Sequence, residues 1–149
     1  MSAKKLEKLL MDDEVDSWIN IIDCFQTIFS KLEIGLADDG LNVTRFQVLF
    51  YLYFNGNLNA NALSKKLLVT RGNMSQLLKR MEADGLISLE TIAGKKSINL
   101  KITKVGRRQF EIVFPKHIKR VKALVTPLSE STLNEIKNLK KGAERAVLK

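Results

Sequence analysis

The 149-residue sequence contains only one cysteine, one histidine and two prolines. Because Cys24 is the single cysteine, an intramolecular disulfide framework and a thiolate zinc cluster are both excluded. The single histidine, His117, argues against a catalytic zinc site built from protein ligands alone. We therefore expect a protein that uses no metal ion and no other cofactor.

Long apolar segments and enzyme motifs are also missing from the sequence. The longest uninterrupted apolar run covers residues 48–54, whereas a helix that spans a bilayer needs about twenty apolar residues. The first residues run into a charged stretch and lack the apolar segment of a secretory signal. Neither a glycine-rich phosphate-binding loop nor an H-E-x-x-H zinc motif occurs. These absences predict a cytoplasmic protein that is not an enzyme and does not enter a membrane.

Acidic residues are scarce in the middle of the chain. Residues 1–40 carry four Lys and nine Asp or Glu, whereas residues 60–108 carry eleven Lys or Arg and three acids. The whole chain has a formal net charge of +9. The basic residues alternate with regularly spaced apolar positions, so they belong to a folded segment rather than to a charged tail. Such a segment predicts a polyanionic partner.

Apolar residues recur at spacings of three and four along much of the chain, which predicts amphipathic helices. The first apolar stripe begins at Trp18 and predicts a helix over residues 12–34. A long helix from residue 104 crosses Pro115, and a proline at such a position usually kinks a helix. Pro127 closes this helix, and Ser129 is expected to cap a last one.

Residues 43–54 are rich in aromatics and are compatible with either a buried strand or a helix. The helical spacing of Phe46, Leu49 and Leu52 favours a helix. Two further helices are predicted from their boundaries. One covers residues 59–67, with Asn59 as its cap, and the next begins after Thr70 and ends at Gly85.

The apolar period changes to two in the segment that follows. Alternating apolar residues occur at Ile87 and Leu89 and again at Ile98, Leu100 and Ile102, with a glycine-containing turn between the two runs. This pattern predicts a β-hairpin. A short helix, a tight turn, a basic helix and a hairpin, in this order, are typical of a winged helix-turn-helix, whose second helix enters the major groove of DNA.

Three segments resemble the MarR family of bacterial transcriptional regulators. Residues 59–70 (NANALSKKLLVT) are similar to the family's first helix and turn, and residues 73–87 (NMSQLLKRMEADGLI) to its recognition helix and the start of its wing. Residues 102–106 (ITKVG) are similar to the junction between the wing and a long helix. The resemblance extends from about residue 15 to the end. It implies a homodimeric repressor that binds a palindromic operator in double-stranded DNA and is released by a small-molecule effector.

The expected fold is mainly α with a small β-hairpin wing (α+β), forming one domain over residues 1–149. Residues 41–103 would form the winged helix-turn-helix lobe, and residues 12–34 together with residues 104–148 a helical dimerisation region. Two positions depart from the family pattern. The wing tip reads AGKKS where the family usually carries an Asp-x-Arg pair, so no such bridge can hold this loop. Leu68 occupies a turn position where a small residue is common.

The predicted recognition helix carries polar side chains opposite its apolar face. Arginine pairs with guanine, and asparagine or glutamine with adenine, so the first turns are expected to read bases. The predicted base-reading residues are Arg71, Asn73, Ser75 and Gln76. The residues predicted to bind phosphate or to act from the wing are Lys65, Lys66, Thr70, Lys79, Arg80, Lys95 and Lys96.

The terminal helices carry more apolar surface than a lobe of about sixty residues needs, which predicts an isologous homodimer interface. The residues predicted to form it are Ile21, Ile28, Leu133, Ile136 and Leu139. The resemblance also implies a pocket for a small aromatic effector such as a phenolic acid. Its candidate lining is Trp18, Phe25, Phe29, Phe50 and Tyr53, although aromatic residues at helical spacing are more often plain core.

Three alternatives remain open at this stage. Cys24 is either a redox sensor, as in some family members, or a partly buried structural thiol, and the lack of a nearby basic residue favours the second. His117 is either a ligand-binding or pH-sensitive group or a surface histidine, and the surface position is favoured. The lobe as a whole could instead be a protein-interaction module without sequence-specific DNA binding, although such a module would not need a basic polar helix face.

Overall fold

The computed structural model describes residues 3–67, 70–91 and 98–146. Within these residues it contains seven α-helices and three β-strands. In chain order they are α1 (Ala3–Leu9), α2 (Asp13–Asp38), α3 (Val43–Asn55), β1 (Leu58–Asn59), α4 (Ala60–Leu67), α5 (Arg71–Ala83), β2 (Ile87–Thr91), β3 (Ile98–Ile102), α6 (Lys104–Leu124) and α7 (Glu130–Arg145).

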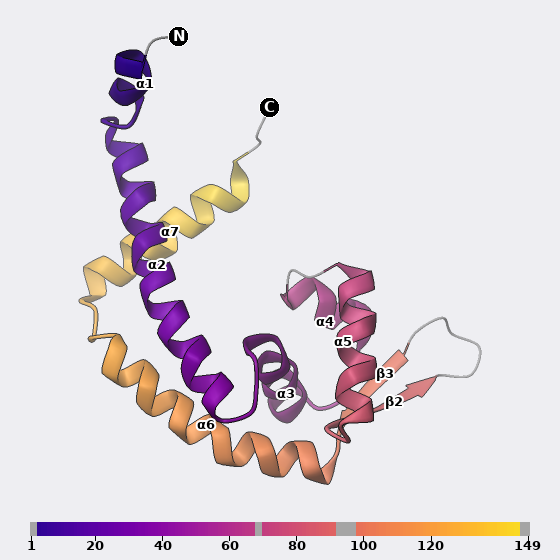
Figure 1. The fold of residues 1–149 in the computed structure, drawn as a ribbon. Helices are drawn as coiled ribbons and strands as arrows, with labels where there is room; N and C mark the ends of the chain where they lie inside the picture. Colours follow the sequence, from indigo (N-terminus) through magenta and orange to yellow (C-terminus); the bar gives the residue numbers. More distant parts are fainter. Residues whose placement is uncertain (1–2, 68–69, 92–97, 147–149) are drawn as a thin grey trace.

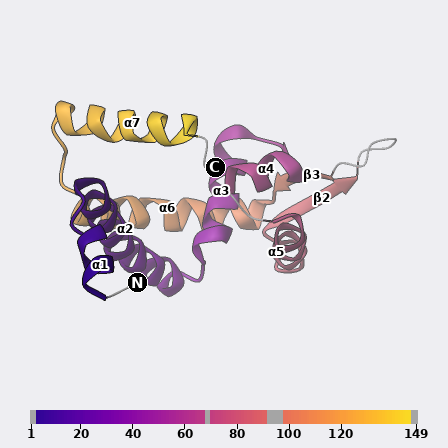
Figure 2. The ribbon, with the colours of Figure 1, turned by 90° about the horizontal axis from the view of Figure 1, so that it is seen from above.

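The helix α6 connects the two parts of the molecule. Figure 1 shows it as an arc that joins a lobe made of α3, α4, α5 and the sheet to the long helices α2 and α7 at its other end. Seen from above, α7 lies apart from the lobe, while α2 and α6 cross (Figure 2). No helix in the described part of the chain is long and apolar enough to span a membrane.

Several helices begin where a side chain caps the first free backbone N–H groups. The Asn59 side chain accepts a hydrogen bond from the backbone N of Ala62 at 2.7 Å, and Thr70 Oγ1 accepts one from Asn73 at 3.3 Å. Ser129 caps α7 in the same way, through the backbone N of Thr132 at 3.2 Å. These three predicted caps are confirmed, and they fix the starts of α4, α5 and α7.

The sheet has the antiparallel strand order β1-β3-β2. Leu100 on the central strand pairs with Leu89 of β2 and with Leu58 of β1. The hairpin of β2 and β3 is confirmed, as is the helix over residues 43–54. The strand β1 was not predicted, because two residues are too few to show an alternating pattern. The helix α1 was not predicted either, and α2 extends four residues beyond its expected end at residue 34.

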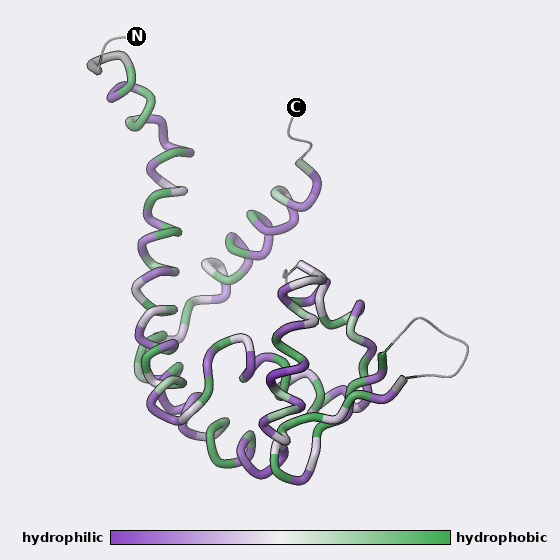
Figure 3. Tube along the Cα trace, turned by 45° about the vertical axis from the view of Figure 1, so that its right-hand side comes forward, coloured by the Kyte–Doolittle hydropathy of each residue, from purple (hydrophilic) through white to green (hydrophobic). Residues whose placement is uncertain are grey.

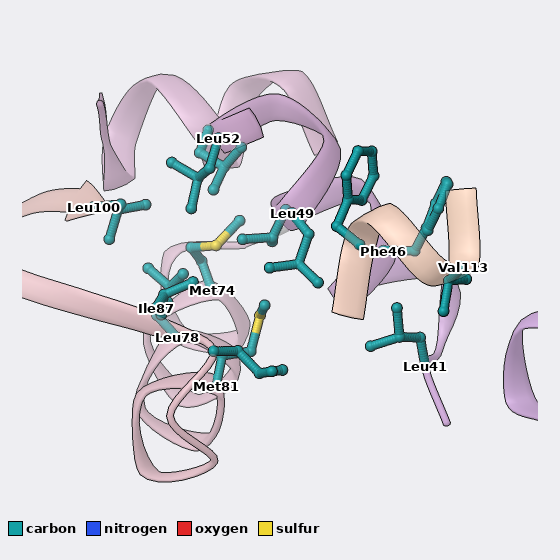
Figure 4. Packing of buried hydrophobic residues seen from close by; sticks show 14 of the residues in the cluster. Leu41, Phe46, Leu49, Leu52, Met74, Leu78, Met81, Ile87, Leu100 and Val113 are labelled. Atoms are coloured by element: carbon teal, nitrogen blue, oxygen red, sulfur yellow. The ribbon is translucent and has the colours of Figure 1, made fainter. Parts of the chain in front are cut away.

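The core lies between α5, α3 and the sheet. Met74, Leu78 and Met81 of α5 are at most 3% exposed, and they lie against Leu49 and Leu52 of α3 (Figure 4). Ile87 and Leu100 close the same core from the sheet. On the other side of α3, Phe46 packs on Phe110 and Phe114 of α6, with ring centroids 5.7 and 6.5 Å apart. The apolar face of α5 is thereby buried on the rest of the lobe.

The first turn of α6 is fixed to the turn that follows α5. Thr103 Oγ1 donates to the backbone oxygens of Gly85 and Leu86 at 2.6 and 3.1 Å, and it accepts from the backbone N of Gly106 at 3.0 Å. A Cβ at Gly106 would overlap the carbonyl oxygen of Leu86. Only a glycine therefore allows this close approach of α6 to the lobe.

The crossing of α2 and α6 is held by charge. The Asp39 carboxylate, which is 8% exposed, accepts hydrogen bonds from Lys116 at 2.8 Å and from Arg120 at 2.6 Å. These two donors hold the pKa of Asp39 below its usual value of 3.8. Arg120 reaches Asp39 by passing over Gly35, where a Cβ would come within 2.6 Å of its side chain.

Replacing Gly106 by alanine tests the close approach of α6. Because the added Cβ overlaps a backbone oxygen that cannot rotate away, Gly106→Ala is expected to lower the free energy of unfolding by about 2–3 kcal/mol. Urea unfolding followed by circular dichroism measures this value. Gly142→Ala is the matched control, since a Cβ there meets nothing within 4 Å and alanine favours a helix. Equal stability of the two variants would contradict the proposed contact.

Removing the negative charge of Asp39 tests the crossing of α2 and α6. Asp39→Asn is expected to lower the free energy of unfolding at pH 7 by about 1 kcal/mol, because two charge-assisted hydrogen bonds are weakened. The folded-state pKa lies below 3.8, so this stabilisation is lost as the pH falls below that value and Asp39 becomes protonated. The difference in the free energy of unfolding between Asp39→Asn and the native chain should therefore disappear in acid. The exposed Asp38→Asn variant serves as the control, and a difference that persists in acid would refute the assignment.

Candidate nucleic-acid interface

The recognition helix α5 separates an apolar face from a polar one. A helix turns by about 100° per residue, so Gly72, Gln76 and Ala83 lie opposite the buried Met74. Lys79 and Arg80 flank Gln76 on its two sides, and all of these residues are exposed. A helix that is anchored on one face and polar on the other can present side chains to the edges of bases.

Two other predicted base-reading residues lie at the margins of this face. Asn73 lines a hollow together with Asn42, Thr44 and Leu77, next to the start of α3. Ser75 lies on the opposite margin, where it shares a hollow with Lys79, with residues of α4 and with Leu89 and Ile98 of the sheet. Among the predicted base-reading residues whose side chains are described, Gln76 is therefore the one that points most directly away from the lobe.

The predicted phosphate-binding residues are spread over two helices. Lys65 and Lys66 are exposed at the end of α4, and Lys66 Nζ lies 5.3 Å from the ring centroid of Tyr51. The Tyr51 ring attracts this ammonium group and holds the end of α4 against α3. Thr70 is exposed as well, although its hydroxyl oxygen already serves as the cap of α5. The side chain of Arg71 and the wing residues Lys95 and Lys96 lie outside the described residues.

Two contacts that sequence reasoning missed fix the end of α5. Arg45 of α3 forms an ion pair with Asp84 at 2.6 Å, directly after the last turn of α5. The Glu82 carboxylate accepts a hydrogen bond from the backbone N of Leu89 at 3.0 Å, which joins the helix to the wing. Arg45 and Asp84 lie 39 residues apart in the sequence, and Glu82 and Leu89 belong to different elements, so the apolar spacing within one element could not have indicated either contact. They restrict how α5 can rotate relative to α3 and the wing.

The five residues predicted to line an effector pocket fall into two groups. Phe25 and Phe29 stack on each other within α2, with centroids 5.2 Å apart, and Trp18 is 60% exposed on the same helix. Phe50 and Tyr53 belong to an aromatic cluster with Phe54, Phe110 and Phe114 between α3 and α6. Among the described residues, no aromatic pair connects the two groups.

The five residues predicted to form a dimer interface are exposed or half-buried in the single chain. Ile21 on α2 and Leu133, Ile136 and Leu139 on α7 are exposed, while Ile28 is half-buried. Within Glu130–Arg145 no residue is buried. Figure 3 shows hydrophobic and hydrophilic positions alternating along both α2 and α7. The apolar stripes of these helices are thus available for a partner.

The expectation that Cys24 is partly buried is wrong for the described chain, because this thiol is exposed. The buried residues of α2 are confined to Gly35 and Leu36 near its end. Within the described residues, no group of three His, Cys, Asp or Glu side chains could hold a metal ion.

The favoured interpretation of His117 as a surface residue is also wrong. Its ring is half-buried and packs on Phe46, with centroids 4.5 Å apart. Burial, together with the positive charge of Arg120, lowers the pKa of His117 below its usual value of 6.5. Its Nδ1 atom has no hydrogen-bond partner among the residues that the structure describes. The interaction that buries His117 comes from α3, far away in the sequence, and its position within α6 could not reveal it.

Comparison with known proteins agrees with this geometry. Residues 39–96 match the model of the MarR family. The chain is 26% identical over 130 residues to the uncharacterised HTH-type transcriptional regulator YkoM of Bacillus subtilis, covering 84% of each protein.

Two solved structures share the fold. One is AbsC, a MarR family transcriptional regulator from Streptomyces coelicolor, with a TM-score of 0.81, 21% identity, and coverage of 90% of this chain and 95% of AbsC. The other is Sco3205 from the same organism, solved in complex with DNA, with a TM-score of 0.79, 20% identity and coverage of 91% of both chains. With its winged helix-turn-helix lobe and a family-model match over residues 39–96, the chain is similar to the MarR family of transcriptional regulators.

Proposed function

We propose that this protein is a sequence-specific DNA-binding regulator that acts as a homodimeric repressor on a palindromic operator. The observation that carries the proposal is the orientation of α5. Its apolar residues Met74, Leu78 and Met81 are buried, while Gln76 points away from the lobe between the cations Lys79 and Arg80. This arrangement presents a base-reading amide between two groups that can neutralise phosphates.

The charge of the lobe supports binding to DNA rather than to a protein. Residues 60–108 combine eleven basic residues with three acids, and the three acids are Glu82, Asp84 and Glu90. Each of these acids has a partner within the lobe: Glu82 the backbone N of Leu89, Asp84 the Arg45 side chain, and Glu90 the Lys101 side chain at 2.7 Å. The remaining positive charge is therefore available to a polyanion, and binding should weaken steeply with salt.

A homodimer would place two copies of α5 on one face of DNA, about one helical turn apart. The apolar stripes on α2 and α7 supply a surface for it at the end of α6 remote from the lobe. Because α6 connects this surface to the lobe through Thr103 and Gly106, a change in the dimer would move α5. A small effector would then release the protein from its operator by shifting the population toward dimers whose two copies of α5 are wrongly spaced for DNA.

Substitutions on α5 test the assignment of its residues. On an operator selected by the protein from random DNA, Gln76→Ala is expected to cost about 1–3 kcal/mol and to relax the preference at one base pair. Lys79→Ala is expected to weaken binding to all sequences similarly and to lower the salt slope by about one. Fluorescence anisotropy across a salt series measures both effects. Lys137→Ala removes one positive charge from α7 and serves as the control for net charge. Equal effects of Gln76→Ala on operator and random DNA would refute base reading.

A charge placed in the apolar stripe of α7 tests the dimer. Ile136→Asp is expected to raise the dissociation constant of the dimer at least about tenfold, because a carboxylate would be buried without a partner. Analytical ultracentrifugation measures this constant. Asn134→Asp introduces the same charge at an exposed position on another side of α7 and should leave the dimer intact. An unchanged dimer in Ile136→Asp would show that α7 does not form the interface.

A further inference from the structure

A polar hollow of about 220 Å³ lies between the start of α3 and the first turns of α5. Its lining comprises Asn42, Thr44, Asn73 and Leu77, and none of these four residues carries a charge. Leu77 is half-buried and packs against the core of the lobe, so it fixes the floor of the hollow. The other three residues supply hydrogen-bonding side chains from the start of α3 and from α5.

The position of Asn73 on α5 directs it toward the side of a DNA groove. A helix turns by about 100° per residue, so Asn73 points about 60° away from Gln76, toward α3. The major groove is about 12 Å wide, and a helix with its side chains has a diameter of about 10–12 Å. A helix that lies in the groove with Gln76 toward the base edges therefore brings its two margins against the sugar–phosphate walls. On the margin of Asn73, the hollow extends this surface onto α3.

The side chains around the hollow can donate hydrogen bonds to the oxygens of a phosphate. The Asn42 carbonyl oxygen accepts from the backbone N of Arg45 at 2.8 Å, which leaves the amide nitrogen of Asn42 as a donor. Thr44 adds a hydroxyl and Asn73 a second amide. The Thr70 cap on the backbone N of Asn73 holds this part of α5 in place. Asparagine and threonine side chains bind phosphate oxygens in many complexes with DNA and fix the register of the protein.

The charges on this margin of α5 are compatible with a phosphate. Arg80 lies on the same margin as Asn73, two turns further along the helix, and can neutralise the same strand. Asp84 also lies on this margin, but it is roughly 16 Å from Asn73 along the axis at about 1.5 Å per residue. Its carboxylate is moreover paired with the Arg45 guanidinium at 2.6 Å. The negative charge on this side of α5 is therefore both distant from the hollow and paired.

We propose that Thr44 and Asn73 bind one phosphate of the operator backbone, with Asn42 as a further donor, and that Asn73 does not read bases. The sequence predicted Asn73 as a base-reading residue because asparagine pairs with adenine, and it predicted no contact between α3 and DNA. The phosphate contact fixes the depth and the register of α5 in the groove, so that Gln76 meets a defined base pair. This inference rests on the proposed function, since it assigns further residues to the same interface.

Removal of the two donors tests the site by the kind of affinity that is lost. Thr44→Val and Asn73→Ala are each expected to weaken binding to the selected operator and to random DNA alike, by about fivefold. Because neither residue is charged, the salt slope and the preference at each base pair should stay as in the native chain. Thr44→Ser keeps the hydroxyl and should retain native affinity, and Thr27→Val, at an exposed position on α2, is the matched control. Fluorescence anisotropy across a salt series measures these affinities.

Substitutions in the DNA identify the phosphate itself. In a set of operators that each carry methylphosphonate in place of a phosphate, one position per half-site should weaken binding of the native protein but have little further effect on Thr44→Val. Native affinity of Thr44→Val, the lack of such a position, or a base preference relaxed by Asn73→Ala would overturn this proposal and leave the proposed function in place. An absence of DNA binding by the native protein would overturn both.

Discussion

The burial of one face of α5 is the constraint on which the rest of the structure depends. Met74, Leu78 and Met81 lie in a core shared with α3 and the sheet, so the helix cannot turn its polar face inward. Each of these side chains contributes about 1.5–3 kcal/mol by leaving water, far more than any exposed ion pair in the lobe. The position of Gln76, Lys79 and Arg80 on the outer surface follows directly from this packing.

The same constraint extends to the long helices through α6. Thr103 and Gly106 fix α6 to the turn after α5, and Asp39 fixes α2 to α6. A displacement of the terminal helices would therefore be carried to α5 by a rigid connection rather than by a flexible linker.

Local signals in the sequence predicted most of the fold. The caps Asn59 and Thr70, the period of the apolar face of α5 and the alternation in the hairpin depend on neighbours within a few residues. Features that depend on distant partners were missed or wrong. The ion pair of Arg45 with Asp84 and the burial of His117 on Phe46 arise from the packing of helices. Cys24 is exposed in the described chain, where the buried residues of α2 are confined to Gly35 and Leu36 near its end.

The most direct test of the central claim is the affinity of the protein for a selected operator and for a scrambled sequence of equal length, measured by fluorescence anisotropy across a salt series. We predict that both affinities fall steeply with salt and that the operator is preferred by about a hundredfold or more. Binding that falls with salt but shows no preference would contradict sequence reading by α5. An absence of binding at low salt would contradict the DNA-binding account as a whole and favour a protein partner for the lobe.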